Sequence, residues 1–133
     1  MILLAIDPGK KQGWAVFVDG LLVACGKGLE PKRPVDRVVI ELPESRGGHT
    51  NTPVDSLIAL AIEAGAAAGR AQVNGSEIVW AKASAWKGQT PKQICHVRAL
   101  AKLDAKERAI VDASNATGDT LDAVALGLWA LTR

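Results

Sequence analysis

The 133-residue chain contains no apolar stretch of the roughly 18 to 20 residues that a membrane-spanning helix requires. Its amino terminus lacks the basic region, apolar run and small-residue cleavage pattern of a secretory signal peptide. The two cysteines, Cys25 and Cys95, form no Cys-x-x-Cys pair, so the sequence indicates neither a zinc site nor a disulfide framework. We therefore expect a cytoplasmic protein that has reduced thiols and no membrane contact.

A strong excess of one charge is also missing, because 16 basic side chains oppose 14 acidic ones and leave a net charge of +2. Composition alone therefore does not indicate a nucleic-acid-binding protein. The charge is unevenly distributed, however, since residues 82–103 contain five basic side chains and no acidic one, which leaves −3 for the rest of the chain. This division suits a phosphodiester substrate, because basic groups bind backbone phosphates while acidic groups hold a metal ion.

The hydrophobic pattern predicts a mixed α/β fold in one domain that spans residues 1–133, with no repeat or linker. Apolar runs bounded by turn signals predict a first strand that ends at Asp7 and a fourth that ends at Glu41. Asp19-Gly20 is a hairpin signal, so the second and third strands should be antiparallel. The expected strands are residues 2–6, 14–18, 21–25, 38–40 and 77–81.

Thr-Pro pairs at 52–53 and 90–91 predict the starts of two helices, the first of which runs towards Arg70. Two further helices are expected over residues 106–113 and 119–131. Small side chains should let the first helix approach the sheet closely, and apolar side chains at helical spacing should be buried in the second and last helices. The small residues of the first helix are Ala64, Gly65, Ala68 and Gly69. The apolar residues of the second helix are Ile94, Val97, Leu100 and Ala101, and those of the last helix are Leu121, Val124, Ala125, Leu128 and Leu131.

Four acidic residues are candidates for one metal site. Asp7 and Glu41 follow core strands, and Asp119 and Asp122 lie at i, i+3 on one face of the last helix. Two carboxylates about 4 Å apart repel by roughly 4 kcal/mol at an effective dielectric near 20, so only a cation makes such a cluster favourable. Oxygen ligands without cysteine favour Mg²⁺ or Mn²⁺, and two such ions would support phosphodiester hydrolysis.

Each acid also has an ordinary structural interpretation. Asp7 precedes Pro8-Gly9 and suits a turn, whereas Asp119 follows Gly118 and suits a helix N-cap. The helix dipole favours Asp122 in the first turn. Glu41 is the hardest to explain in this way, because glutamate is a poor strand former beside a buried edge.

Three segments resemble the RuvC family of Holliday junction resolvases: Asp7-Pro8-Gly9 followed by Gly13, Glu41 after the fourth strand, and residues 119–127 at the carboxyl terminus. The resemblance implies a ribonuclease H-like fold, a mixed five-stranded sheet that begins with three antiparallel strands and is flanked by helices. There the first and fourth strands lie side by side at the centre. It also implies a homodimeric, metal-dependent endonuclease that nicks four-way DNA junctions without a nucleotide cofactor. The catalytic and metal-binding roles, with two Mg²⁺ or Mn²⁺ per site, would belong to Asp7, Glu41, Asp119 and Asp122.

The chain resembles a compact, phage-type member of that family, which would act in the host cytoplasm. Cellular members have a helix between the third and fourth strands, whereas only residues 29–37 are available here. Extended chain covers roughly 3.3 Å per residue and strands lie about 4.8 Å apart, so this connector is long enough to cross from the edge to the centre.

Six residues are candidate DNA contacts. Lys87 and Lys92 belong to a Trp-Lys-Gly-x-x-Pro-Lys element that resembles one in small RuvC-like proteins, and these two are the preferred phosphate ligands. Solvation of an amphipathic helix would also explain the basic row, and core packing would explain an aromatic residue. His49 and His96 are possible general acids but are not assigned that role. The remaining four candidates are Lys82, Trp86, Arg98 and Arg46.

Two other functions fit the same residues. The chain could cleave structured RNA on the same fold, or it could bind nucleic acid without catalysis. An actin-like kinase also begins with Asp-x-Gly, but its nucleotide lies between two domains, and this chain has room for one.

Overall fold

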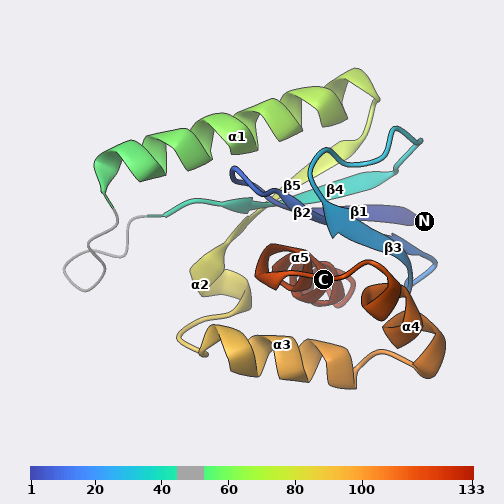
Figure 1. The fold of residues 1–133 in the computed structure, drawn as a ribbon. Helices are drawn as coiled ribbons and strands as arrows, with labels where there is room; N and C mark the ends of the chain where they lie inside the picture. The colour runs from blue at the N-terminus through green and yellow to red at the C-terminus, as the bar shows by residue number, and fades with distance from the viewer. Residues whose placement is uncertain (45–52) are drawn as a thin grey trace.

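The computed structural model describes residues 1–44 and 53–133, which form a five-stranded mixed sheet with helices on both faces (Figure 1). The strand order is β3-β2-β1-β4-β5. The first three strands pair antiparallel, and β4 and β5 continue the sheet in parallel with β1. This arrangement confirms the predicted ribonuclease H-like fold class. The strands are β1 (Ile2–Asp7), β2 (Gly13–Val18), β3 (Leu21–Lys27), β4 (Arg37–Leu42) and β5 (Glu77–Lys82).

The two central strands, β1 and β4, are buried on both faces, which explains their continuous apolar sequences. Leu3 and Ala5 belong to one core cluster, and Leu4 and Ile6 belong to the cluster on the opposite face. Because side chains alternate along a strand, Asp7 is directed to the same face as Leu3 and Ala5.

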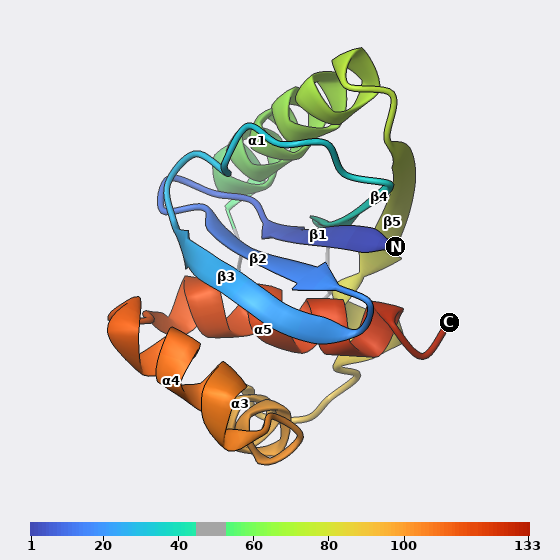
Figure 2. The same cartoon turned by 90° about the vertical axis from the view of Figure 1, so that its right-hand side faces the viewer.

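The helices form two unequal layers around the sheet (Figure 2). One face is covered by α1 (Val54–Val73) and the other by α5 (Gly118–Ala130). Outside α5 lies α3 (Lys92–Ala101), whereas α4 (Ala105–Ala113) packs against β3 beside α5. A capping box between Asp104 and Glu107 begins α4. The short α2 (Ala83–Trp86) follows β5 directly and was not expected from the sequence. Within the described residues, no helix combines the length and apolar character needed to cross a membrane.

Three sequence expectations about buried helix faces were wrong in part. On α3, Ile94, Val97 and Ala101 are exposed, because this helix packs on α5 rather than on the sheet and buries Ala99 instead. On the last helix, Val124 and Ala125 are buried as expected, but Leu121, Leu128 and Leu131 are only partly buried. The sheet covers one side of this helix and α3 covers part of the other, so its buried residues extend beyond one stripe. On α1, the buried small residues are Ala64, Ala67, Ala68 and Ala71, whereas Gly65 and Gly69 are exposed.

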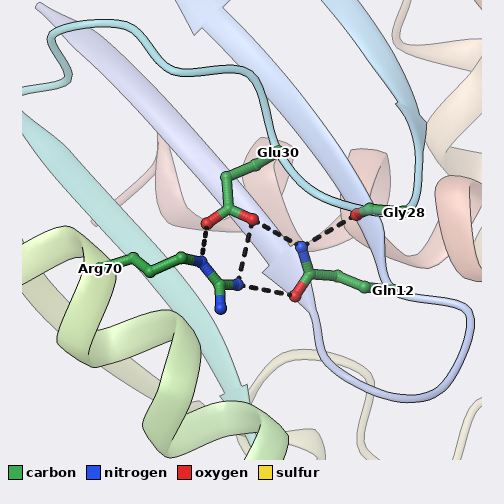
Figure 3. Close-up of polar contacts among 4 residues, drawn as sticks. All are labelled: Gln12, Gly28, Glu30 and Arg70. Atoms are coloured by element: carbon green, nitrogen blue, oxygen red, sulfur yellow. Dashed lines mark hydrogen bonds and ion pairs between the residues drawn. The ribbon is translucent and has the colours of Figure 1, made fainter.

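The connector between β3 and β4 crosses the sheet without a helix, and a polar network secures it (Figure 3). Glu30 accepts hydrogen bonds from Arg70 Nε at 2.6 Å, from Arg70 Nη2 at 3.1 Å and from Gln12 Nε2 at 2.7 Å. The same Gln12 amide donates to the Gly28 carbonyl at 3.0 Å. The network therefore joins the connector to α1 and to the turn that follows Asp7.

Burial alone would raise the pKa of Glu30, but hydrogen bonds from Arg70, from its own backbone and from Gln12 lower it below its usual value, as does the Arg70 charge. The stabilisation from this carboxylate is thus present above the pKa of an unfolded glutamate and is lost as the pH falls through the lowered value.

We expect Arg70→Ala to lower the free energy of unfolding by about 1–3 kcal/mol, because it leaves the Glu30 carboxylate, only 10% exposed, without its charged partner. Urea denaturation measures this loss. The matched control is Glu77→Ala, which breaks the Arg37 pair; since the Glu77 side chain is 60% exposed, its loss should cost less than about 1 kcal/mol. Equal losses for the two variants would contradict a specific role for the network.

Candidate active site

Two acidic side chains lie at the carboxyl ends of the central strands. In the parallel pairing of β1 with β4, Ile6 is opposite Ile40, so Asp7 and Glu41 occupy the next positions on neighbouring strands. Asp7 lies two residues after Ala5 on β1, and Glu41 lies two residues after Val39 on β4. Ala5 and Val39 both belong to the core cluster on the side of the sheet that α5 covers. The two carboxyl groups therefore point to the same face of the sheet, where Glu41 helps to raise the pKa of Asp7.

The amino terminus of α5 is held against this edge by close backbone packing. A side chain at Gly13 would collide with the Asp119 carbonyl, so the glycine allows α5 to touch β2. Thr120 Oγ1 adds a hydrogen bond to the Gly26 carbonyl at 3.2 Å. The N-cap of this helix is Thr117 and not Asp119, so the capping explanation for Asp119 is wrong.

Three carboxylates converge at this point. Asp7, Asp119 and Asp122 each offer one oxygen, and these oxygens all lie within 4.8 Å of one another. Asp122 is only 4% exposed. Burial is the main cause that raises the pKa of Asp7 to about 9, and the hydrogen bond and charge of Glu41 and the charges of Asp122 and Asp119 add to it. The donor set consists of oxygen alone and fits a hard divalent cation such as Mg²⁺ or Mn²⁺.

Basic side chains surround the acidic group. Lys92 Nζ lies 3.0 Å from Asp122 Oδ2, and His96 Nε2 lies 2.7 Å from Asp122 Oδ1. Partial burial would lower the pKa of Lys92, but the hydrogen bond and charge of Asp122 and the charges of Asp119 and Asp7 raise it. Glu41 lies outside the group of three and pairs with Lys87, whose Nζ is 3.4 Å from Glu41 Oε1. The two lysines preferred from the sequence therefore both contact candidate metal ligands.

The other candidate DNA contacts are less closely associated with the acids. Lys82 is exposed at the end of β5, and Arg98 is exposed on α3. Trp86 is half-buried, with the Lys87 ammonium 5.0 Å from its ring centroid. Arg46 lies outside the residues that the structure describes.

His96 lies in the site, although the sequence assigned it no role. It lies one helical turn after Lys92, and this i, i+4 spacing puts both side chains on the same face of α3, above Asp122. Since an ionised carboxylate can only accept a hydrogen bond, His96 Nε2 is the donor in that pair. The i, i+4 spacing of His96 from Lys92 was the available sequence signal for a role of His96 in the site. This spacing is too common on helices to identify a site residue.

We expect His96→Ala to weaken Mn²⁺ binding by about 10- to 100-fold, the usual effect of losing a group that orients a metal ligand. Isothermal titration calorimetry of the metal-free protein with Mn²⁺ measures the change. Val97→Ala is the control, because the neighbouring Val97 side chain is 67% exposed. Unchanged Mn²⁺ affinity in His96→Ala would show that the histidine does not orient Asp122 for metal binding.

The chain was compared with protein families, curated proteins and solved structures. Neither the family models nor the curated proteins give a match. Among solved structures, Thermus thermophilus RuvC in complex with a Holliday junction substrate aligns with a TM-score of 0.71 at 17% identity, over 97% of this chain and 91% of that chain. Another T. thermophilus RuvC structure aligns at 0.57 and 18% identity, over 97% and 92% of the two chains.

A viral protein has the same arrangement of elements. The fowlpox virus Holliday junction resolvase aligns with a TM-score of 0.59 at 15% identity, over 99% of this chain and 98% of that chain. At these identities the likeness concerns the fold, and it extends over nearly the whole of each chain. The protein described here thus has the fold of RuvC and of the fowlpox resolvase.

Proposed function

We propose that this protein is a divalent-metal-dependent endonuclease that hydrolyses phosphodiester bonds in four-way or related branched DNA. The observation that carries the proposal is the convergence of Asp7, Asp119 and Asp122 at the carboxyl edge of the sheet. The fold shared with a RuvC that was solved with a Holliday junction substrate favours branched DNA as the substrate.

The four acids would hold the metal, with Glu41 joining the three convergent carboxylates. Two divalent cations bound here would activate a water molecule and stabilise the leaving oxygen of the scissile phosphate. The protein's own contribution is positioning: Gly13 and Thr120 fix the start of α5, while β1 and β4 fix Asp7 and Glu41.

Lys87 and Lys92 would bind the phosphates next to the bond that is cleaved. Each ammonium now neutralises one carboxylate, Glu41 or Asp122. When the carboxylates bind a cation, their attraction for the lysines weakens, and both ammonium groups become available to the DNA backbone. The same two residues thereby reduce acid repulsion in the metal-free protein and would bind substrate in the loaded one.

A nicking assay tests the proposed function. Purified protein in Mg²⁺ or Mn²⁺ should nick a labelled four-way junction and leave a linear duplex of the same sequence intact, and EDTA should stop the reaction. A junction of matched sequence made of RNA distinguishes a structured-RNA nuclease. Binding of the junction without cleavage in either metal would support the non-catalytic alternative and overturn the proposal.

We further infer that the active form is a homodimer that pairs through α1. Paired cuts across a two-fold junction need two active sites, and a symmetric dimer matches a symmetric substrate. Three apolar residues of α1 lie along one exposed face at i, i+4 and i+8, and an exposed stripe of this kind is typical of an interaction surface. They are Val54, Ile58 and Ile62, which are 70%, 53% and 65% exposed.

Light scattering tests the dimer. The unmodified chain should have the mass of a dimer at micromolar concentration, and Ile58→Lys with Ile62→Lys should convert it to a monomer. Val97→Lys, an equivalent change at an exposed position on α3, should leave the dimer intact. A monomeric unmodified chain, or a dimer that survives both α1 changes, would contradict this surface.

A further inference from the structure

A cavity of about 220 Å³ lies between α2, α3 and the carboxyl-terminal half of α5. Its walls include two indoles, Trp86 and Trp129, and three cationic side chains, Lys87, Arg98 and Lys102. No acidic side chain is among the residues that line it. The cavity is connected to the candidate active site through Lys87, whose ammonium lies 3.4 Å from Glu41 Oε1.

The cavity gathers cationic side chains, and two of them have no acidic partner among the described residues. Arg98 and Lys102 make no ion pair in the part of the chain that the structure describes. Arg98 lies on α3 and Lys102 is the C-cap residue of that helix, and both line the cavity at i, i+4 spacing.

These features together specify the chemistry of a ligand. Two aromatic side chains provide flat stacking surfaces, and the guanidinium and ammonium groups require an anion. A nucleotide supplies both partners, because its base is flat and its phosphate is anionic. The volume is below the roughly 300–1,000 Å³ that drug-sized ligands occupy, so it suits a single base and excludes a base pair.

We propose that this cavity binds one unpaired nucleotide of the branched DNA substrate, with its base against the indoles of Trp86 and Trp129 and its phosphate on Arg98 and Lys102. The inference rests on the proposed function and adds a recognition step to it. Capture of a base costs least where that base is already unpaired, so this pocket favours branched DNA that contains an unpaired base over a fully paired linear duplex. Lys87 would then bridge the captured nucleotide and the acidic group that carries the chemistry.

Fluorescence of 2-aminopurine tests the pocket directly. The base analogue is placed in an unpaired position next to the branch of a junction, and the metal-free full chain is titrated so that no cleavage occurs. Stacking on an indole should quench the fluorescence, whereas 2-aminopurine paired inside an arm should not respond. We expect Arg98→Gln, which removes a phosphate contact, and Trp129→Leu, which removes a base contact, each to weaken binding of the unpaired probe by about 5- to 100-fold.

Two matched controls identify the cavity as the site. Trp80→Leu removes an exposed indole on β5 and Lys106→Gln an exposed cation on α4, and neither residue lines the cavity. Both should leave the affinity within about twofold, which is usual for surface changes. Arg98 is exposed, so Arg98→Gln tests the site even if Trp129→Leu fails to fold.

The outcomes separate this inference from the proposed function. Equal effects of Arg98→Gln and Lys106→Gln, or no quenching by the unmodified chain, would overturn the nucleotide pocket. If the unmodified chain nevertheless nicks a junction in Mg²⁺, the proposed function stands without the pocket. If quenching follows the expected pattern and no metal supports nicking, the pocket stands and the nuclease proposal fails.

Discussion

Asp7→Asn is expected to reduce the rate of junction nicking by at least about a thousandfold, because metal catalysis of phosphoryl transfer contributes several kcal/mol and each 1.36 kcal/mol is a factor of ten. The amide keeps the shape of the side chain but lacks the charge that a cation requires. Asp7 is the central member of the cluster, since it contacts Glu41 across the sheet and also belongs to the group with Asp119 and Asp122. Binding of the junction should persist, because the basic residues are unchanged.

The control for this prediction is Asp112→Asn. It makes the same chemical change at an exposed position on α4, outside the acidic group. Single-turnover nicking in saturating Mg²⁺, with binding followed in parallel by fluorescence anisotropy, compares the two variants. Nicking by Asp7→Asn at the rate of Asp112→Asn would exclude Asp7 as a metal ligand.

Although Asp7→Asn should reduce nicking, it should raise the stability of the folded chain at alkaline pH when no metal is present. The pKa of Asp7 is raised to about 9, mainly by burial and then by the hydrogen bond and charge of Glu41 and the charges of Asp122 and Asp119. The folded chain therefore holds a proton that an unfolded aspartate releases above about pH 4. Between about pH 4 and 9 the folded state binds more protons, so its stability falls as the pH rises, by at most roughly 1.4 kcal/mol per pH unit for one proton.

Thermal unfolding at a series of pH values tests this prediction. In EDTA, the melting temperature of the unmodified chain should fall between pH 6 and 9, and Asp7→Asn should be the more stable protein at pH 9. Added Mg²⁺ should stabilise the unmodified chain more at pH 9 than at pH 6, because binding releases the proton, and it should have little effect on the variant. A melting temperature that rises towards pH 9 in EDTA would contradict the raised pKa of Asp7.

The sequence predicted those parts of the fold and site that depend on short, regular patterns. The apolar run of residues 2–6 required a doubly buried strand, and the turn signal after it fixed where Asp7 would lie. Simple chain length also showed that the connector predicted over residues 29–37 could cross the sheet without a helix, as the structure confirms. Parallel pairing of β1 with β4 then makes Asp7 and Glu41 neighbours.

Features that depend on which element packs against which were not predictable. The apolar residues Ile94 and Val97 have the spacing of a buried face, but α5 already covers this side of the sheet, so α3 packs as an outer layer and leaves them exposed. The contact of His96 with Asp122 depends on the same layering. Glu30 and Arg70 are 40 residues apart, and no local pattern indicates that they meet.

Diffraction from crystals grown with Mn²⁺ tests the metal centre most directly, because manganese scatters anomalously and can be located independently of the protein. We expect anomalous peaks within coordination distance of Asp7, Asp119 and Asp122, with Glu41 ligating at least one of the ions and with Lys92 displaced from Asp122. Absence of manganese at the carboxyl edge of β1, with Lys92 still paired to Asp122, would contradict the account.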